Sequence, residues 1–233
     1  MNVRQLQPEI MDDPGLDGEQ HFQALRGLAR LNRWSRSASI VWPEIQKLAG
    51  QLPGQTIRIL DVATGGGDIP IGIYQRALLF GLKVQISGWD LSPRAVNYAR
   101  QRAREANAQI EYFEFNALQD DWPQEYDVIL SSLFLHHLET EKAERLLSNM
   151  AKNAKKLVLI NDLLRTRSGL MLAKVATRLL SSSGVVHADG PQSVRAAFTL
   201  EEIRVIAERA GLHGFTLKRR WPCRFLLTWA RNL

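Results

Sequence analysis

The sequence has very little cysteine, because Cys223 is the only one among its 233 residues. An internal disulfide is therefore excluded, and so is a zinc site built from several cysteines. No uninterrupted apolar run approaches the roughly 18 residues that span a bilayer, and the first residues lack the basic start and apolar stretch of a secretory signal. We therefore expect a cytoplasmic protein without a transmembrane helix.

Basic residues exceed acidic ones, which gives a formal charge of +6 and a pI near 9.7. The cations are spread along the chain and form no run typical of a nucleic-acid-binding arm. The excess is therefore interpreted as a solvated surface, and a nucleic-acid partner is not expected.

The order of the expected elements indicates an α/β fold. Five apolar, β-branched runs are expected as strands: residues 56–63, 83–90, 110–116, 126–135 and 155–164. Helices are expected between them at residues 68–80, 92–107 and 139–153. This alternation predicts a parallel sheet with helices on both faces.

The end of the chain breaks the alternation. A helix at 199–211 precedes two strands, 215–222 and 223–231, which are joined too tightly to be parallel. The sequence therefore predicts a seven-stranded, mostly parallel sheet that is finished by an antiparallel C-terminal hairpin.

The most informative motif is LDVATGGGD at residues 60–68. Asp61 ends the first expected strand, and Gly65, Gly66 and Gly67 form the turn into the next helix. Glycines there allow positive φ and a close approach of the backbone to a ligand. A second acid, Asp90, ends the second strand, where a carboxylate can accept hydrogen bonds from both hydroxyls of a ribose.

These residues resemble the class I S-adenosylmethionine-dependent methyltransferases, a Rossmann-like family whose first strand ends in an acidic residue followed by alternating glycines. Asp61, Ala63, Gly65 and Gly67 hold those positions, with Ala63 in place of the usual first glycine. The ubiquinone/menaquinone-biosynthesis subgroup is the most similar, because its fourth strand also runs into a Leu-His-His-Leu segment. The resemblance implies S-adenosylmethionine as cofactor and S-adenosylhomocysteine (SAH) as product.

The same resemblance assigns site residues. Asp90 would bind ribose, Leu91 would flank adenine, and Asn116-Ala117 would face the adenine edge. Apart from the resemblance, the N-terminal segment is expected to close over the amino-acid end of the cofactor, with Arg33 as the partner of its carboxylate. The full set of cofactor-binding candidates is Arg33, Asp61, Ala63, Thr64, Gly65, Gly67, Asp90, Leu91, Asn116, Ala117 and Ser131.

The implied reaction is methyl transfer, at oxygen or carbon, to a small lipophilic or aromatic acceptor of phenolic, quinol-like or polyketide-like type. His136 and His137 follow the fourth strand and are the catalytic candidates, since histidine is a natural base near neutral pH. In the similar plant-type O-methyltransferases a Leu-His-Asp segment supplies the base, and here His137 replaces that aspartate. No oligomeric state follows from the sequence.

A single domain, residues 1–233, is expected to have four parts. Residues 1–52 form a helical N-terminal cover, 53–164 the cofactor-binding core, 165–198 a lid insertion, and 199–233 the final helix and hairpin. Within the cover, the first 18 residues are expected to be loosely held, and Pro43 is expected to open a second helix.

The lid insertion supplies further candidates. His187 and Asp189, in a polar segment interpreted either as a pocket-lining pair or as a Gly-Pro turn, are expected to contact the substrate. Asp162, at the end of the fifth strand, is a third substrate candidate. The apolar stripe of the lid helix at 166–183, which also carries basic residues, is suited to packing on its own domain or to transient contact with an anionic membrane surface.

A nicotinamide-dependent oxidoreductase would need G-x-G-x-x-G, which this turn fits poorly, and no tyrosine is followed by lysine four residues later. A non-catalytic binding module of the same fold remains open, although the intact turn and Asp90 favour an enzyme. A magnesium site like that of catechol-type methyltransferases lacks its carboxylate at Ser131-Ser132, so no metal is expected.

Overall fold

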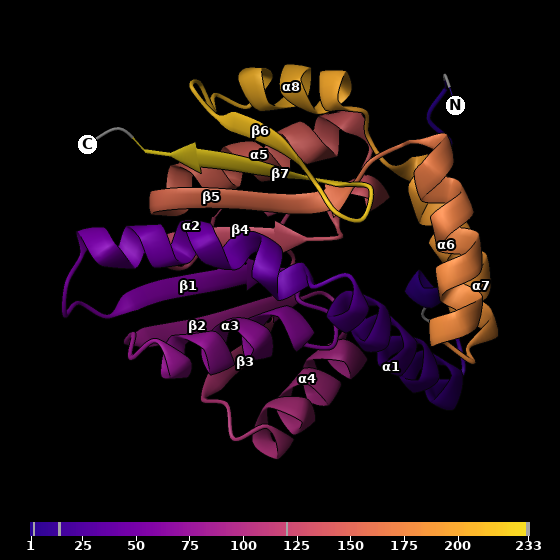
Figure 1. Cartoon of the computed structure of the whole chain (residues 1–233), viewed down its shortest axis with the longest axis horizontal. Helices are drawn as coiled ribbons and strands as arrows, with labels where there is room; N and C mark the ends of the chain where they lie inside the picture. The colour runs from indigo at the N-terminus through magenta and orange to yellow at the C-terminus, as the bar shows by residue number, and fades with distance from the viewer. Residues whose placement is uncertain (2, 14, 120, 232–233) are drawn as a thin grey trace.

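A seven-stranded sheet in the order β3-β2-β1-β4-β5-β7-β6 forms the centre of the computed structural model, which describes residues 1, 3–13, 15–119 and 121–231 (Figure 1). Five strands pair in parallel: β1 (Ile57–Val62), β2 (Val84–Asp90), β3 (Ile110–Glu114), β4 (Tyr126–Ser132) and β5 (Ala154–Leu163). β7 (Arg224–Ala230) runs antiparallel to both β5 and β6 (Thr216–Arg220). The predicted fold class is confirmed.

Helices cover both faces of the sheet, as predicted. α2 (Ser37–Gln51), α3 (Asp68–Leu79) and α4 (Pro93–Glu105) cover one face, and α5 (Thr140–Asn153) and α8 (Leu200–Arg209) cover the other. Successive strand residues point to opposite faces. In β4, for example, Val128 packs with α2 and α3 while Ile129 packs with α5 and α8. The central strands β1, β4 and β5 are buried on both faces, which explains their continuous apolar runs.

Two helix starts have the capping that their sequences predict. The Ser92 hydroxyl accepts the amide N–H of Ala95, with Pro93 as the first residue of α4. Thr199 and Glu202 form a reciprocal capping box at the start of α8. These local interactions fix where the two helices begin.

A helical cover lies beyond the carboxyl ends of the parallel strands (Figure 1). It consists of α1 (Gly18–Trp34), the lid helices α6 (Arg167–Leu180) and α7 (Gly184–Ala196), and a short 3₁₀ turn at Ile10–Asp12. None of the helices in the described ranges is both long and apolar enough to cross a membrane.

Two expectations about helices are wrong. The break in the N-terminal cover lies at Arg36, whose φ of 55° ends α1, and Pro43 lies inside α2. Proline there removes one backbone hydrogen bond, which the buried face of α2 offsets by packing on the sheet. The polar segment that was interpreted as a turn is α7, whose Val185, Val186 and Val194 are buried.

The other corrections concern loops. The fourth strand ends at Ser132 instead of residue 135, because Leu133 has a φ of 59° and Leu135–His137 form a 3₁₀ turn. Residues 3–13, which we call the N-terminal strap, are held against α7 and were expected to be loose. The Asp189 carboxylate accepts the backbone N–H groups of Ile10 and Met11, both at 3.0 Å, which explains the difference.

Candidate active site

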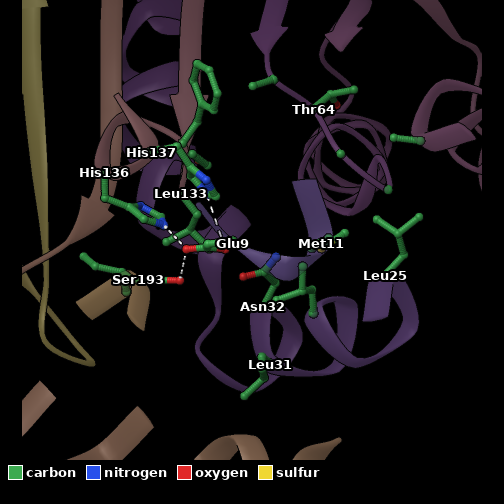
Figure 2. A pocket seen from close by; sticks show the side chains of 18 of the residues that line it. Glu9, Met11, Leu25, Leu31, Asn32, Thr64, Leu133, His136, His137 and Ser193 are labelled. Atoms are coloured by element: carbon green, nitrogen blue, oxygen red, sulfur yellow. Dashed lines mark hydrogen bonds and ion pairs between the residues drawn. The ribbon is translucent and has the colours of Figure 1, made fainter. Parts of the chain in front are cut away.

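A cavity of about 930 Å³ lies between the carboxyl edge of the sheet and the helical cover. This volume is at the upper end for ligand pockets, so the cavity has room for two small molecules side by side. Its walls come from the β1–α3 turn, the ends of β2 and β3, the loop after β4, and α1, α6, α7 and the strap. Figure 2 shows part of this lining.

The β1–α3 turn places three residues in left-handed conformations. Ala63, Gly65 and Gly67 have φ values of 56°, 54° and 74°. Ala63 carries a Cβ in this region, which costs about 1 kcal/mol. At Gly67 a Cβ would lie 2.6 Å from the Tyr112 hydroxyl, so only glycine allows α4 and β3 to pack against the turn.

Asp61 is a buried carboxylate at the start of this turn, with 2% of its surface exposed. Its Oδ2 accepts the Thr64 hydroxyl at 2.8 Å, whereas Oδ1 has no hydrogen-bond partner among the described residues. Burial raises the pKa of Asp61 well above its ordinary value, Asp68 and Asp90 add to the rise, and the Thr64 hydrogen bond opposes it. The ligand-free site therefore holds an uncompensated acid.

Asp90 connects the ends of β1 and β2. Its Oδ2 accepts the Gly65 N–H at 2.8 Å and its Oδ1 accepts the Ser92 N–H at 2.9 Å. Burial raises the pKa of Asp90, and these two backbone hydrogen bonds oppose the rise. The carboxylate lines the cavity beside the turn and is rigidly held.

Most of the remaining cofactor candidates also line the cavity. Thr64, Leu91, Asn116 and Ala117 do so, and Asn116 Oδ1 accepts the Leu118 N–H at 3.0 Å. Three candidates are not brought there. Gly67 lies within the β1–α3 turn but is not among the described residues of the lining. Ser131 donates its hydroxyl to the Val62 carbonyl at 3.0 Å, between strands, and Arg33 is exposed and is not among the described residues of the lining.

A buried arginine that sequence reasoning missed lies on the opposite wall. Arg224, at the start of β7, is 5% exposed and donates to the hydroxyls of Ser35 and Ser37. Its Nε has no partner among the described residues. Burial lowers the pKa of Arg224 to about 10, so the guanidinium stays charged at neutral pH. Arg224 lines the cavity, as Arg94 does, whereas Arg33 is not among the described lining residues.

His136 is held by Asp162. The His136 Nδ1 lies 2.7 Å from Asp162 Oδ1, and the His136 backbone N–H donates to Asp162 Oδ2 at 3.1 Å. Burial alone would raise the pKa of Asp162, but His136 outweighs it and keeps the pKa below its ordinary value. Asp162 lies behind His136 and is not among the described lining residues, so its expected contact with the substrate stays a prediction.

His137 is held by the N-terminal strap. Its Nδ1 lies 3.0 Å from Asp12 Oδ2, while Glu9 places one carboxylate oxygen 3.8 Å from each histidine Nε2. Burial opposes protonation of His137, but the Asp12 hydrogen bond and the Glu9 charge raise its pKa to about 9. Figure 2 shows Glu9 between the two imidazoles and Ser193.

The two lid candidates lie outside the cavity lining as described. His187 Nε2 is 2.8 Å from the Ser181 carbonyl, where it stabilises the link between α6 and α7. Asp189 binds the backbone of the strap and is not bonded to His187. The residues of α7 that do line the cavity are Gly190, Ser193 and Val194.

Four functional candidates were missed by the sequence reasoning: Glu9, Asp12, His21 and Arg224. Their neighbours in the sequence are ordinary, and all four reach the cavity only through contacts between distant segments. The sequence of the strap shows no helical or strand periodicity, so no pattern pointed to Glu9 and Asp12 as functional residues.

The segment that contains the β1–α3 turn also matches a known protein family. Residues 59–156, less than half of the chain, match the protein family described as “Methyltransferase domain”. Among curated protein sequences, none matches the chain.

Solved structures share the fold across most of the chain. One is a magnesium protoporphyrin IX methyltransferase from Synechocystis PCC 6803 with bound SAH, at 21% identity and a TM-score of 0.60, covering 95% of this chain and 91% of that one. The S-adenosylmethionine-dependent methyltransferase SibL has 16% identity and a TM-score of 0.65, covering 95% and 60%. The CurJ carbon methyltransferase has 15% identity and a TM-score of 0.61, covering 83% and 53%.

The uncompensated charge of Asp61 predicts a stability effect. Its pKa in the folded chain is raised, so the wild type loses stability as the pH rises from the ordinary carboxyl pKa through the raised one. Asp61→Asn removes the charge, and we expect it to raise the free energy of unfolding of the ligand-free protein by about 1–2 kcal/mol at pH 8.

Urea unfolding over a pH series measures the effect. The difference should vanish below the ordinary carboxyl pKa, where Asp61 is neutral in both states. Asp121→Asn, at an exposed acid, is the control. A lower stability of Asp61→Asn at every pH would show that the Asp61 charge is compensated in the folded chain.

Proposed function

With residues 59–156 identified as a methyltransferase domain of the S-adenosylmethionine-dependent class, we propose that the chain methylates an oxygen atom of a small, lipophilic aromatic acceptor. The observation that carries the proposal is the single cavity in which the β1–α3 turn, an apolar lid wall and a histidine cluster meet. S-adenosylmethionine supplies a methyl group on a positively charged sulfur, already activated for transfer to a nucleophile.

The residues of the turn fit this cofactor. Gly65 has no atoms within 4 Å of the position a Cβ would take, which leaves the backbone open to a ligand. Asp90, next to it, is suited to the ribose hydroxyls. The amino-acid end of the cofactor carries an ammonium and a carboxylate, and the cavity holds one unpartnered atom for each, Asp61 Oδ1 and Arg224 Nε. These groups support assigning Asp61, Asp90 and Arg224 to the cofactor.

The acceptor would occupy the remaining space under the lid. The wall formed by α6 and α7 offers Leu172, Ala173, Ala176 and Val194, which favour an apolar molecule. At the polar end, His136 and His137 are the side chains suited to hold the nucleophilic atom of the acceptor. The cover excludes water, and the rigid turn and histidines orient the two reactants. A hydroxyl acceptor is favoured because this end provides polar groups that a carbon nucleophile would not use.

We also propose transient contact with an anionic membrane surface, which would deliver a lipophilic acceptor. The outer face of α6 exposes apolar side chains at Met171, Val175 and Leu179, by 62%, 52% and 78%. The same face exposes Arg167, Lys174 and Arg178. Mixed apolar and basic side chains on one face suit an interfacial helix.

Asp90 is the direct test of cofactor binding. We expect Asp90→Ala to weaken SAH binding by about 10- to 100-fold in isothermal titration, because charge-assisted hydrogen bonds to the ribose are lost. Asp121→Ala, which removes an exposed acid, should leave the affinity unchanged. Equal binding by all three proteins, or binding of NAD(H) in place of SAH, would contradict the proposal.

A pair of lid variants tests where the acceptor binds. Ala173→Phe fills the cavity wall, and we expect it to lower kcat/KM for hydroxylated aromatic acceptors by about tenfold or more while the SAH affinity is kept. Val175→Phe introduces the same side chain on the exposed face of α6 and should change neither quantity. SAH production with a panel of phenols measures the rates. Loss of activity in both variants would place the acceptor elsewhere.

Membrane contact is tested by flotation with liposomes. We expect the protein to float with vesicles that contain anionic lipid at low salt, and less so at high salt, because screening weakens the basic residues of α6. The double variant Val175→Glu/Leu179→Glu should stay in the dense fraction. A wild type that remains there at low salt would argue against the membrane contact and leave the methyl transfer untouched.

A further inference from the structure

Three metal-ligating side chains converge at the polar end of the cavity. Glu9 Oε1 lies 3.8 Å from His136 Nε2, and Glu9 Oε2 lies 3.8 Å from His137 Nε2. One ligand atom from each residue lies within 4.8 Å of the others. At 3.8 Å neither pair is a hydrogen bond. An ion bound at roughly 2.0–2.2 Å from each ligand would need only a small inward movement of the three side chains.

Each histidine is oriented by a carboxylate on its other ring nitrogen. Asp162 holds His136 Nδ1 at 2.7 Å, and Asp12 holds His137 Nδ1 at 3.0 Å. With a proton kept on each Nδ1, a metal ion that displaces the proton from Nε2 would meet two ring nitrogens that lie beside Glu9 (Figure 2). Metal-binding histidines are held in this way by outer carboxylates, which fix the ring orientation.

The charges around this cluster are unbalanced. Three carboxylates, those of Glu9, Asp12 and Asp162, surround the two imidazoles. Arg4 is close by, but its guanidinium donates to the backbone carbonyls of His136 and Leu138. Ser193 donates to Glu9 Oε1, which leaves Oε2 without a hydrogen bond among those described. A bound cation would offset the excess of negative charge.

From this arrangement we infer that Glu9, His136 and His137 bind a divalent transition-metal ion of the Zn²⁺ type. Two imidazoles with one carboxylate are the donor set of catalytic zinc sites and of related iron sites, in which one position or more stays open. Mg²⁺ prefers oxygen ligands only, so it is a poor occupant. The site differs in its donors from the magnesium site of catechol-type methyltransferases, for which this chain lacks the carboxylate at Ser131-Ser132.

The ion would join two parts of the chain. Glu9 belongs to the N-terminal strap, whereas both histidines belong to the loop after β4, so a shared ion ties the strap across the cavity. Its further role rests on the proposed function: the open position would hold the acceptor oxygen as an anion, with the hydroxyl proton released to solvent. The oxygen lone pair would form the bond to the methyl carbon while the sulfur–methyl bond of S-adenosylmethionine breaks, and its electron pair would stay on the sulfur of the leaving SAH.

The experiment uses the full chain without a polyhistidine tag, after treatment with a chelator. Zn²⁺ and Co²⁺ are titrated by calorimetry, with Mg²⁺ as the negative control, and visible absorption of Co²⁺ reports the nitrogen ligands. Glu9→Gln and His137→Gln keep the size of the side chains and change one ligand each. His213→Gln, at an exposed histidine that pairs with Glu208, is the matched control. Unfolding curves in chelator show that each variant is folded.

We expect one Zn²⁺ per chain, an affinity at least tenfold lower in Glu9→Gln and in His137→Gln, and an unchanged affinity in His213→Gln. Zn²⁺ should also slow proteolysis within residues 3–13 of the wild type but not of Glu9→Gln. Equal Zn²⁺ binding by wild type and both site variants, or no Zn²⁺ binding by the wild type, would overturn the metal site. SAH binding by the chelated protein is measured in parallel, so failure of the metal site is distinguished from failure of the proposed function.

Discussion

Parallel pairing of five strands is the constraint on which the whole site depends. It brings the carboxyl ends of β1, β2, β4 and β5 to one edge of the sheet, so Asp61, Asp90 and Asp162 lie along the same edge although they are far apart in sequence. Each acid then acquires a different partner. Asp90 accepts two backbone N–H groups, Asp162 orients His136, and Asp61 keeps one oxygen without a partner among the described residues. One edge of the sheet thus carries a rigidly held carboxylate at Asp90, one that orients a histidine at Asp162, and one with an unpaired oxygen at Asp61.

The cavity is built at a cost to stability. Burying a charged group is unfavourable unless its polar atoms are paired, and Asp61 Oδ1 and Arg224 Nε both lack a hydrogen-bond partner among the described residues. Ala63 adds backbone strain in the same turn. These features gather on the walls of one cavity, while the core under it is apolar and closely packed. Ligand binding would relieve the charges, which links affinity to stability.

The sequence predicted the sheet, the reversed hairpin and the glycine turn because each leaves a local signal. Apolar runs, the Ser92-Pro93 start and the Thr199–Glu202 capping box are set by neighbouring residues. The strap and α7 could not be predicted in this way. Glu9 and Asp12 lie in a polar segment, and α7 contains glycine and proline, so both segments depend on contacts with distant residues, such as Asp189 with the backbone of Ile10 and Met11. Arg224 was missed for the same reason, since only the fold brings it to Ser35 and Ser37.

The strap also has a consequence for the order in which the protein is completed during synthesis. Residues 3–13 are made long before their partners on α7, because Asp189, Ser193 and Ala196 lie 179 to 192 residues further along the chain. The core strands β1 to β5 can fold in the interval, because domains form as units while synthesis continues. The strap must therefore stay without these partners until α7 has been made. A nascent chain that still lacks α7 has neither this wall of the cavity nor the contacts that hold the strap against it.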